Sequence, residues 1–220
     1  LASDKRQETT NKIQKDHLKT LTKVYMNLAE PEEAAEMAKR HVDGIGLLRA
    51  EFMIAGIGVH PKQFLKQGKG HVFVQRLTHD LLKFVKPFHP RPVIYRATDF
   101  KTNEYKHLKG GAHYEPHEEN PMLGFRGASR YIADPEEFFL ELEALKNIWN
   151  MGYSNLHLMI PFVRRPWELV KIKSLVEQSG LLAMPGFRML IMVEVPAAAL
   201  ELEEFLKVGV DGVSIGTNDL

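Results

Sequence analysis

Short apolar runs alternate with longer amphipathic runs along most of the chain. Seven of the short runs predict β-strands, because they are rich in β-branched and aromatic residues and are flanked by turn residues. They cover residues 22–28, 45–48, 92–97, 123–126, 156–163, 189–195 and 212–215. Because several of these runs are apolar on both faces, they are typical of a parallel sheet that is covered on each side.

The amphipathic runs predict helices between these strands. Proline is favoured at the first helical position, where its missing N–H needs no partner. On this ground and on apolar spacing, helices are expected to begin at Pro31, Pro135, Pro166 and Pro196, with another around 74–85. Asp134 is a candidate N-cap for the helix over 135–150. The segment after 45–48 is interpreted as an insertion and the polar stretch 101–120 as a loop.

Alternating strands and helices without a Gly-x-Gly-x-x-Gly fingerprint favour a (β/α)8 TIM-type barrel over a doubly wound sheet. An open barrel of seven strands would leave two unpaired edges. We therefore expect an α/β barrel truncated after about seven strands, with its eighth unit outside this chain. The predicted domains are a polar N-terminal linker over 1–20 and an incomplete barrel over 21–220.

Composition narrows the possible chemistry. The 220 residues are 44% hydrophobic and carry a net charge of +1, so no overall field selects nucleic acid or an anionic membrane. The absence of cysteine excludes a disulfide framework, a thiolate metal site and a cysteine nucleophile within this chain. No apolar run can span a bilayer and no signal peptide is present, so we expect a cytoplasmic protein without membrane or nucleic-acid partners.

Polar residues cluster where the predicted strands end. In a parallel barrel these carboxyl ends face one mouth, where functional residues collect. The residues concerned are Asn27, Arg49, Arg96, Arg126, Pro161, Glu194, Asn218 and Asp219. Guanidinium groups match carboxylate and phosphate oxygens, and two carboxylates with open coordination positions suit Mg²⁺. Together they predict a small ligand that bears phosphate and carboxylate or enolate groups.

Each of these residues has a structural alternative. Arg49 or Arg96 alone would fit a surface salt bridge. Glu194 would fit a partnered buried carboxylate, and Asp219 would fit a turn. Their shared position at successive strand ends favours the functional interpretation. Solvated positions, rather than ligand contacts, are expected for a second charged set: Lys101, Lys106, His113, His117, Glu118 and Glu119.

Six segments carry a family resemblance. They are GIGLLRAEFM (44–53), YRATDFKTNEY (95–105), ENPMLGFRGASRY (119–131), LMIPFVR (158–164), MVEVPAAAL (192–200) and GVSIGTNDL (212–220). In this order they resemble the C-terminal domain of the phosphoenolpyruvate (PEP)-utilising enzymes. That family includes phosphoenolpyruvate synthase, pyruvate phosphate dikinase and Enzyme I of the sugar phosphotransferase system. The arginine stretch RATDFKTNEY is similar to the synthase branch.

The resemblance implies roles for individual residues. Arg49 and Arg96 would bind the phosphoryl group and the carboxylate of the substrate, and Arg126 would add a third positive group. Glu194 and Asp219 would coordinate Mg²⁺. The remaining pocket lining would come from Gly216, Thr217 and Asn218.

The reaction implied is that of ATP, pyruvate and water giving AMP, PEP and phosphate by way of a phosphohistidine. This barrel would host phosphoryl transfer to the Mg²⁺-bound enolate of pyruvate. The expected partners are pyruvate or PEP, phosphohistidine and ATP-binding domains of a longer enzyme, and further copies in a homo-oligomer. Because the family's proton-donor cysteine and those domains are missing, we expect this chain alone to be inactive, with no catalytic residue of its own.

Three alternatives stay open at this point. The chain could belong to a dikinase or Enzyme I-type member of the same family. It could be an Mg²⁺-enolate aldolase or lyase, for which the extra arginines are not needed. It could also be a truncated binding or assembly module that kept the residues without the chemistry.

Overall fold

The computed structural model describes residues 20–220. The predicted linker over 1–20 lies outside the described residues except for its last position, so its boundary with the barrel stays a prediction. The described part forms an α/β fold built on six parallel strands in the order β1-β2-β3-β4-β5-β6. The strands are Tyr25–Leu28, Gly44–Arg49, Val93–Arg96, Leu156–Ile160, Met189–Val193 and Gly212–Ile215.

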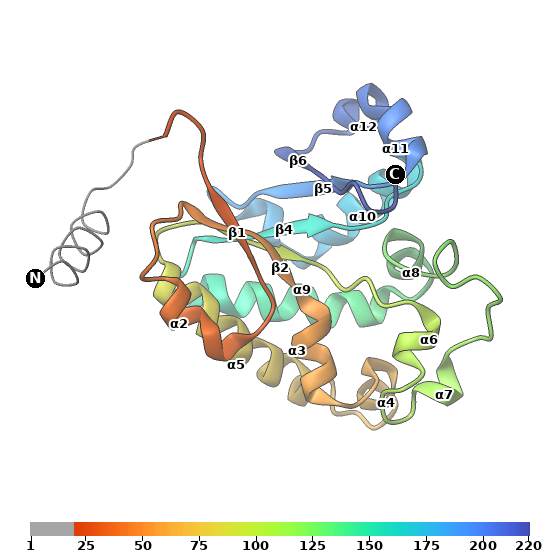
Figure 1. The fold of residues 1–220 in the computed structure, drawn as a ribbon. Coiled ribbons are helices and arrows are strands. Elements are labelled where there is room, and N and C mark those ends of the chain that lie inside the picture. The colour runs from red at the N-terminus through yellow and green to blue at the C-terminus, as the bar shows by residue number, and fades with distance from the viewer. Residues whose placement is uncertain (1–19) are drawn as a thin grey trace, which may run out of the picture.

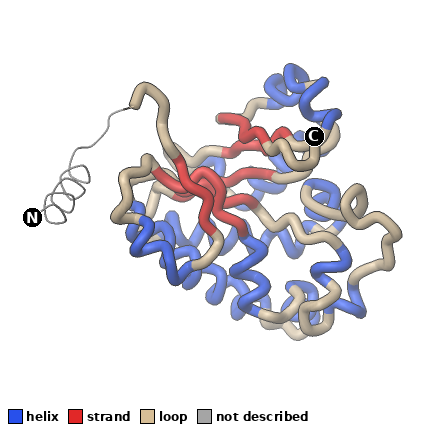
Figure 2. Tube along the Cα trace, in the orientation of Figure 1, coloured by secondary structure: helices blue, strands red, loops and turns tan. Residues whose placement is uncertain are grey.

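The sheet curls as it runs from β1 to β6 (Figure 1). Its main helices pack along its outside and are α5 (Gly70–Phe88), α9 (Pro135–Asn150) and α10 (Pro166–Ser179). Each strand pairs in parallel with the next strand in sequence, which requires a crossover after every strand. Figure 2 shows the strands as one curved layer with helices below and beside it. Six parallel strands curled in this way are consistent with a TIM-type barrel that is incomplete within this chain, as the sequence predicted.

The predicted strand over 123–126 is wrong. The segment consists of turns, in which Leu123 N–H donates to Asn120 O and Gly124 N–H donates to Pro121 O. The N–H of Phe125 donates to the Glu118 carboxylate at 2.9 Å instead of to a neighbouring strand. Because β3 pairs directly with β4, the sheet has no position left for this segment.

The helices and short 3-10 turns lie between the strands and have the following bounds: η1 Pro31–Glu33, α2 Ala34–Met37, α3 Ala50–Ile57, α4 Pro61–Lys66, α5 Gly70–Phe88, α6 Thr102–Tyr105, α7 Gly111–Tyr114, α8 Ala128–Ala133, α9 Pro135–Asn150, α10 Pro166–Ser179, η2 Leu181–Ala183, α11 Pro196–Leu200 and α12 Leu202–Val208. All four proline-initiated helices are confirmed, α9 with its predicted bounds. The insertion after β2 is largely helical, as α3 and α4, and the expected loop 101–120 contains α6 and α7.

Burial explains which strands the sequence marked most clearly. All five residues of β4 are buried, which is why that run is apolar on both faces. By contrast, residues of β6 alternate between partly buried and exposed, and Ile215 is 71% exposed. One face of this strand is therefore partly buried and the other is exposed.

A buried ion network holds the excursion, which is the long segment between the end of β3 and the start of α9. Arg130 donates two hydrogen bonds, both 2.8 Å, to the carboxylate of Glu115. The same carboxylate lies 2.9 Å from His60 Nε2, while His60 Nδ1 accepts from the N–H of Lys62 at 3.1 Å. Since Nδ1 is an acceptor, Nε2 carries the proton and donates to Glu115. The network pins the excursion to α4 and so fixes the loop that leads to Arg126.

Asp134 occupies the predicted N-cap position of α9, but its side chain does not cap the helix. Its carboxylate accepts from Lys62 Nζ at 2.8 Å instead. Lys62 also lies 3.6 Å from Glu137, a buried carboxylate whose two oxygens have no hydrogen-bond partner among the described residues. Burial raises the pKa of Glu137 to about 7, although Arg130 and Lys62 partly oppose the shift.

We expect Glu137→Gln to remove a pH dependence of stability. Because the folded-state pKa of about 7 exceeds the ordinary 4.5, the carboxyl contributes fully below pH 4.5 and loses its contribution as pH rises through 7. The free energy of unfolding of wild type should therefore fall relative to the variant, by at most about 1.4 kcal/mol per pH unit. Urea denaturation at pH 5, 6, 7 and 8 measures this, with exposed Glu136→Gln as the control. A difference that is the same at every pH would contradict it.

Candidate anion-binding site

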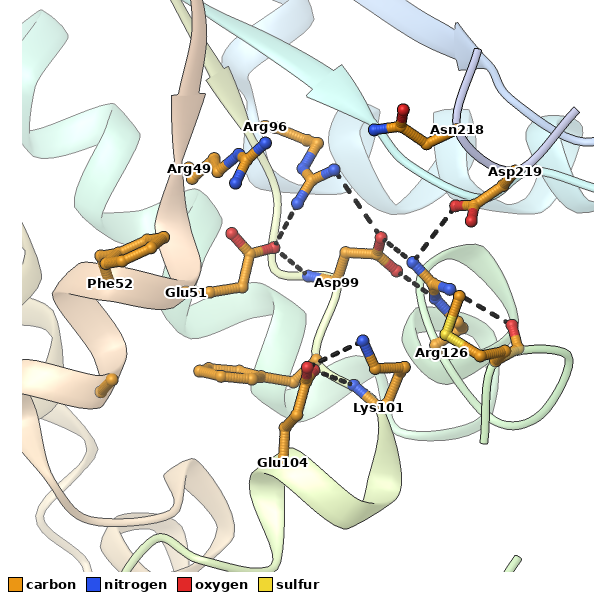
Figure 3. Close-up of a pocket in the computed structure, with 13 residues that line it drawn as sticks. Arg49, Glu51, Phe52, Arg96, Asp99, Lys101, Glu104, Arg126, Asn218 and Asp219 are labelled. Atoms are coloured by element: carbon orange, nitrogen blue, oxygen red, sulfur yellow. Dashed lines mark hydrogen bonds and ion pairs between the residues drawn. The ribbon is translucent and has the colours of Figure 1, made fainter. Parts of the chain in front are cut away.

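The ends of β2 and β3, the loop before α8 and the segment after β6 meet around one cavity of about 500 Å³ (Figure 3). Its charged lining contains four cationic and four acidic side chains, which are Arg49, Arg96, Lys101, Arg126, Glu51, Asp99, Glu104 and Asp219. Phe52, Ala55, Phe100, Met122 and Asn218 complete the wall. The cavity is therefore strongly polar and balanced in formal charge.

Two arginines enter the cavity from neighbouring strands. Arg49 ends β2 and Arg96 ends β3, and the two residues are direct partners in the parallel register. Their side chains thus start from the same level of the sheet. Arg49 is exposed, and its side chain makes no hydrogen bond or ion pair within residues 20–220, so its guanidinium is available to a ligand. Arg96 is held instead, because its Nη2 donates to Glu51 Oε1 at 3.0 Å.

Arg126 is fixed by a bidentate ion pair with Asp99. Its Nε and Nη2 donate to the two oxygens of Asp99 at 3.0 and 2.6 Å, and both side chains are buried. Its Nη1 donates to the carbonyl of Met122 at 3.2 Å, and Asp219 lies 3.8 Å from Nη2. Burial lowers the pKa of Arg126, but Asp99, Asp219 and Glu194 together raise it above its usual value. This guanidinium is a fixed positive charge at any useful pH.

Glu51 links α3 to Arg96 and to the segment after β3. Its Oε1 accepts from Arg96 and also from the backbone N–H of Asp99 at 2.7 Å, so it ties the first turn of α3 to the end of β3. Its Oε2 is buried and has no hydrogen-bond partner among the described residues. Burial raises the pKa of Glu51, and Arg96 partly opposes this. Figure 3 shows Glu51 and Asp99 on either side of the Arg96 guanidinium.

Glu194 lies behind the cavity wall rather than on it. It follows β5, is 4% exposed, and accepts a 2.7 Å hydrogen bond from the backbone N–H of Phe162. Burial and the nearby charge of Asp99 raise its pKa to about 7. A Cβ at Gly216 would lie 2.9 Å from Glu194 Cβ, so the chain after β6 can pass this close because residue 216 is glycine.

The structure brings together five of the eight residues predicted to bind substrate. The cavity lining contains Arg49, Arg96, Arg126, Asn218 and Asp219, and it does not contain Glu194, Gly216 or Thr217. Glu194 and Gly216 pack against each other at the side of the cavity, whereas Thr217 is exposed. Their assignment as substrate contacts therefore stays a prediction.

Sequence reasoning missed Glu51 and Asp99. They follow the strand-end arginines Arg49 and Arg96 by two and three residues, so the same strand-end argument could have included them. Lys101 also lines the cavity, where it pairs with Glu104 at 2.8 Å, although a solvated position was expected. Glu118 is partly buried and accepts from Thr102 Oγ1 and Phe125 N, so the solvated interpretation was wrong for it as well.

The remaining members of that second charged set are exposed as expected: Lys106, His113, His117 and Glu119.

Among residues 20–220, no three acidic or histidine side chains gather closely enough to hold a metal ion by themselves. Glu194 and Asp219 offer two carboxylates, and any further ligands would have to be water or substrate. Within the same range, no helix is long and apolar enough to cross a membrane.

Comparison with known proteins identifies the class to which this cavity belongs. Residues 2–220 match the family model of the PEP-utilising enzyme, PEP-binding domain, and the chain belongs to this family. The described cavity accordingly lies in a PEP-binding domain, at the carboxyl ends of parallel strands, as expected for barrels of this kind.

Proteins named phosphoenolpyruvate synthase or probable phosphoenolpyruvate synthase are similar over most of the chain. The synthase of Aeropyrum pernix is 46% identical over 208 residues, which cover 91% of this chain and 25% of that protein. The probable synthase of Staphylothermus marinus is 45% identical over 205 residues, and that of Methanocaldococcus jannaschii is 41% identical over 217. These alignments cover 24% and 18% of the two relatives. The chain thus spans about a quarter or less of the length of these curated relatives.

We expect Asp99→Asn to destabilise the fold, because it leaves the buried guanidinium of Arg126 without its compensating charge. Removing one partner of a buried ion pair typically costs about 3–5 kcal/mol, and the asparagine oxygen can recover part of this. Urea denaturation at pH 7 measures the change. The control is Glu36→Gln in the exposed pair with Lys39, which should leave stability nearly unchanged because solvent screens the pair. Equal effects of the two variants would contradict the assigned role of Asp99.

Proposed function

We propose that this chain is the PEP- and pyruvate-binding domain of a phosphoenolpyruvate synthase. In the complete enzyme it would take part in converting ATP, pyruvate and water into AMP, PEP and phosphate by way of a phosphohistidine. The observation that carries the proposal is the cavity in which Arg49, Arg96 and Arg126 converge with Asn218 and Asp219, within a chain of the PEP-binding family. ATP-binding and phosphohistidine domains would be supplied outside this chain, and we propose a homo-oligomer in the cytoplasm.

The three arginines divide the task of binding an anion. Arg49 is unpaired among the described residues and can turn its full hydrogen-bonding capacity to a phosphoryl group or a carboxylate. Arg96 and Arg126 are already held by carboxylates, so they offer their remaining N–H groups in fixed directions. Fixed donors of this kind stabilise charge on a transferring phosphoryl group without reorganising at the moment of reaction.

The balance of charge in the cavity explains why a cation would be needed. Four positive side chains face four acidic ones, so an anion that carries both phosphate and carboxylate would add uncompensated negative charge. A divalent cation would offset it. Glu194 supports this view, because its pKa near 7 reflects burial beside another carboxylate without enough positive charge nearby.

The chemistry of the two candidate carboxylates would suit Mg²⁺. Glu194 and Asp219 are hard oxygen ligands, and two carboxylates leave coordination positions for water and substrate oxygens, as Mg²⁺ prefers. When bound there, Mg²⁺ would supply electrostatic stabilisation for an enolate oxygen. The side chains of Arg49 and Arg96 would orient the phosphoryl group. Asn218, which Figure 3 shows between Arg96 and Asp219, would contact the three-carbon unit.

Arg96→Ala should reduce PEP formation in the full-length enzyme. Loss of one preorganised donor to a developing charge typically lowers kcat about 10²–10³-fold. Steady-state kinetics with pyruvate and ATP measure kcat/KM, and exposed Arg76→Ala provides a control with the same loss of charge. An unchanged kcat/KM in Arg96→Ala would sink the assignment.

Glu194→Gln should abolish the dependence of PEP binding on Mg²⁺, because an amide is a much weaker ligand for a hard cation than a carboxylate. Isothermal titration calorimetry of PEP into the protein with and without Mg²⁺ measures this. In wild type we expect at least about a tenfold gain in affinity with Mg²⁺, and in the variant no gain. Exposed Glu203→Gln should behave as wild type. If the variant gained as much affinity from Mg²⁺ as wild type, the metal role of Glu194 would be wrong.

A further inference from the structure

Phe162 has a backbone conformation that residues other than glycine rarely adopt. Its φ is 52°, and it is the non-glycine residue with positive φ among residues 20–220. A bulky side chain at positive φ is unfavourable and persists only where the surroundings enforce it. Phe162 is 2% exposed, so its ring is enclosed by the surrounding structure.

The peptide unit between Pro161 and Phe162 is held at both of its polar groups. The carbonyl of Pro161 accepts from the N–H of Ala128 at 3.2 Å. The N–H of Phe162 donates to Glu194 Oε1 at 2.7 Å. One planar peptide therefore links the carboxylate that follows β5 to the start of α8, two residues after Arg126.

The side chain of Phe162 reinforces the same link. Its ring contacts the guanidinium of Arg126, whose Cζ lies 4.0 Å from the ring centroid, and that of Arg164 at 4.5 Å. Cation–π attraction to one ring offsets the repulsion between these two cations. Arg164 in turn donates to the carbonyl of Gly124 at 2.6 Å and so fixes the loop that carries Arg126.

Gly127 shows how tightly this contact is built. Residue 127 also has a positive φ, of 54°, a backbone conformation that favours glycine. A Cβ placed on it would lie 2.6 Å from Phe162 Cβ and 2.8 Å from the carbonyl of Pro161. Only glycine lets the two segments of the chain approach this closely, so Phe162 and the segment after Arg126 form one close-packed unit.

We propose that Phe162 is a positioning residue that ties the Glu194 carboxylate to the Arg126 guanidinium. Its strained peptide sets the direction of the carboxylate, and its ring sets the plane of the guanidinium. The cation-binding and anion-binding ends of the site are thereby held as one rigid unit. The inference rests on the proposed function for the identity of the ligands, but the link itself is a property of the ligand-free protein.

The test compares Phe162→Leu with Phe84→Leu in the full-length protein. Both remove one buried phenyl ring, and Phe84 lies in α5, outside the cavity lining. We expect both variants to lose thermal stability. Phe162→Leu alone should also weaken binding of Mn²⁺, followed by electron paramagnetic resonance, and of PEP, followed by calorimetry, each about tenfold. Affinities equal to wild type, or equal losses in both variants, would overturn the proposal.

A second measurement needs no ligand and separates failure of this inference from failure of the proposed function. In ¹⁵N-labelled protein without metal, Glu194→Gln should shift the amide resonance of Phe162, and Phe162→Leu should shift the Nε–H resonance of Arg126. Phe84→Leu should shift neither. If wild type bound neither Mn²⁺ nor PEP, the proposed function would fail, and these resonances would still decide the positioning role. If Phe162→Leu does not fold, the shift of the Phe162 amide resonance in Glu194→Gln decides the positioning role by itself. The absence of that shift would overturn the positioning role.

Discussion

The bidentate ion pair between Asp99 and Arg126 is the interaction on which the rest of the site depends. It joins the segment after β3 to a residue 27 positions further along, across the whole excursion that contains α6 and α7. Both groups are buried, so either one alone would be an uncompensated charge in the interior. The pair therefore fixes the loop and the guanidinium together, and the cavity wall exists because this loop is held in place.

The same pairing limits what the cavity can bind. Carboxylates at Glu51 and Asp99 orient Arg96 and Arg126, but they also cancel much of the positive charge that would attract an anion. Pairing with carboxylates therefore has two effects. It fixes the directions of the arginine N–H donors, and it leaves the cavity with a weak net electrostatic field. A site built in this way selects its ligand by the directions of its hydrogen-bond donors rather than by its total charge. It also gives a physical reason for the divalent cation in the proposed function.

Support for the site extends well beyond its lining. The network of His60, Glu115 and Arg130 anchors the excursion to α4, and the strained contact of Phe162 with Gly127 anchors its return to the sheet. None of these residues was among the candidate site residues that the sequence predicted. Side chains of this kind decide where the arginines point, so the stability of the excursion and the geometry of the site are one property.

The sequence alone determined the parallel α/β architecture and the helices that begin at proline, because apolar periodicity and the fixed φ of proline act locally. The strand-end argument also placed Arg49, Arg96, Asn218 and Asp219 at one cavity, since parallel strands bring their carboxyl ends to one edge. Arg126 lines the same cavity, but it reaches it from a turn segment held by Asp99 and not from a strand end. Tertiary structure alone decided that 123–126 is a turn, that Glu51 and Asp99 hold the arginines, and that Glu194 lies behind the wall. Those outcomes depend on burial and on charges from distant segments, whose pairing leaves no local periodicity in the chain.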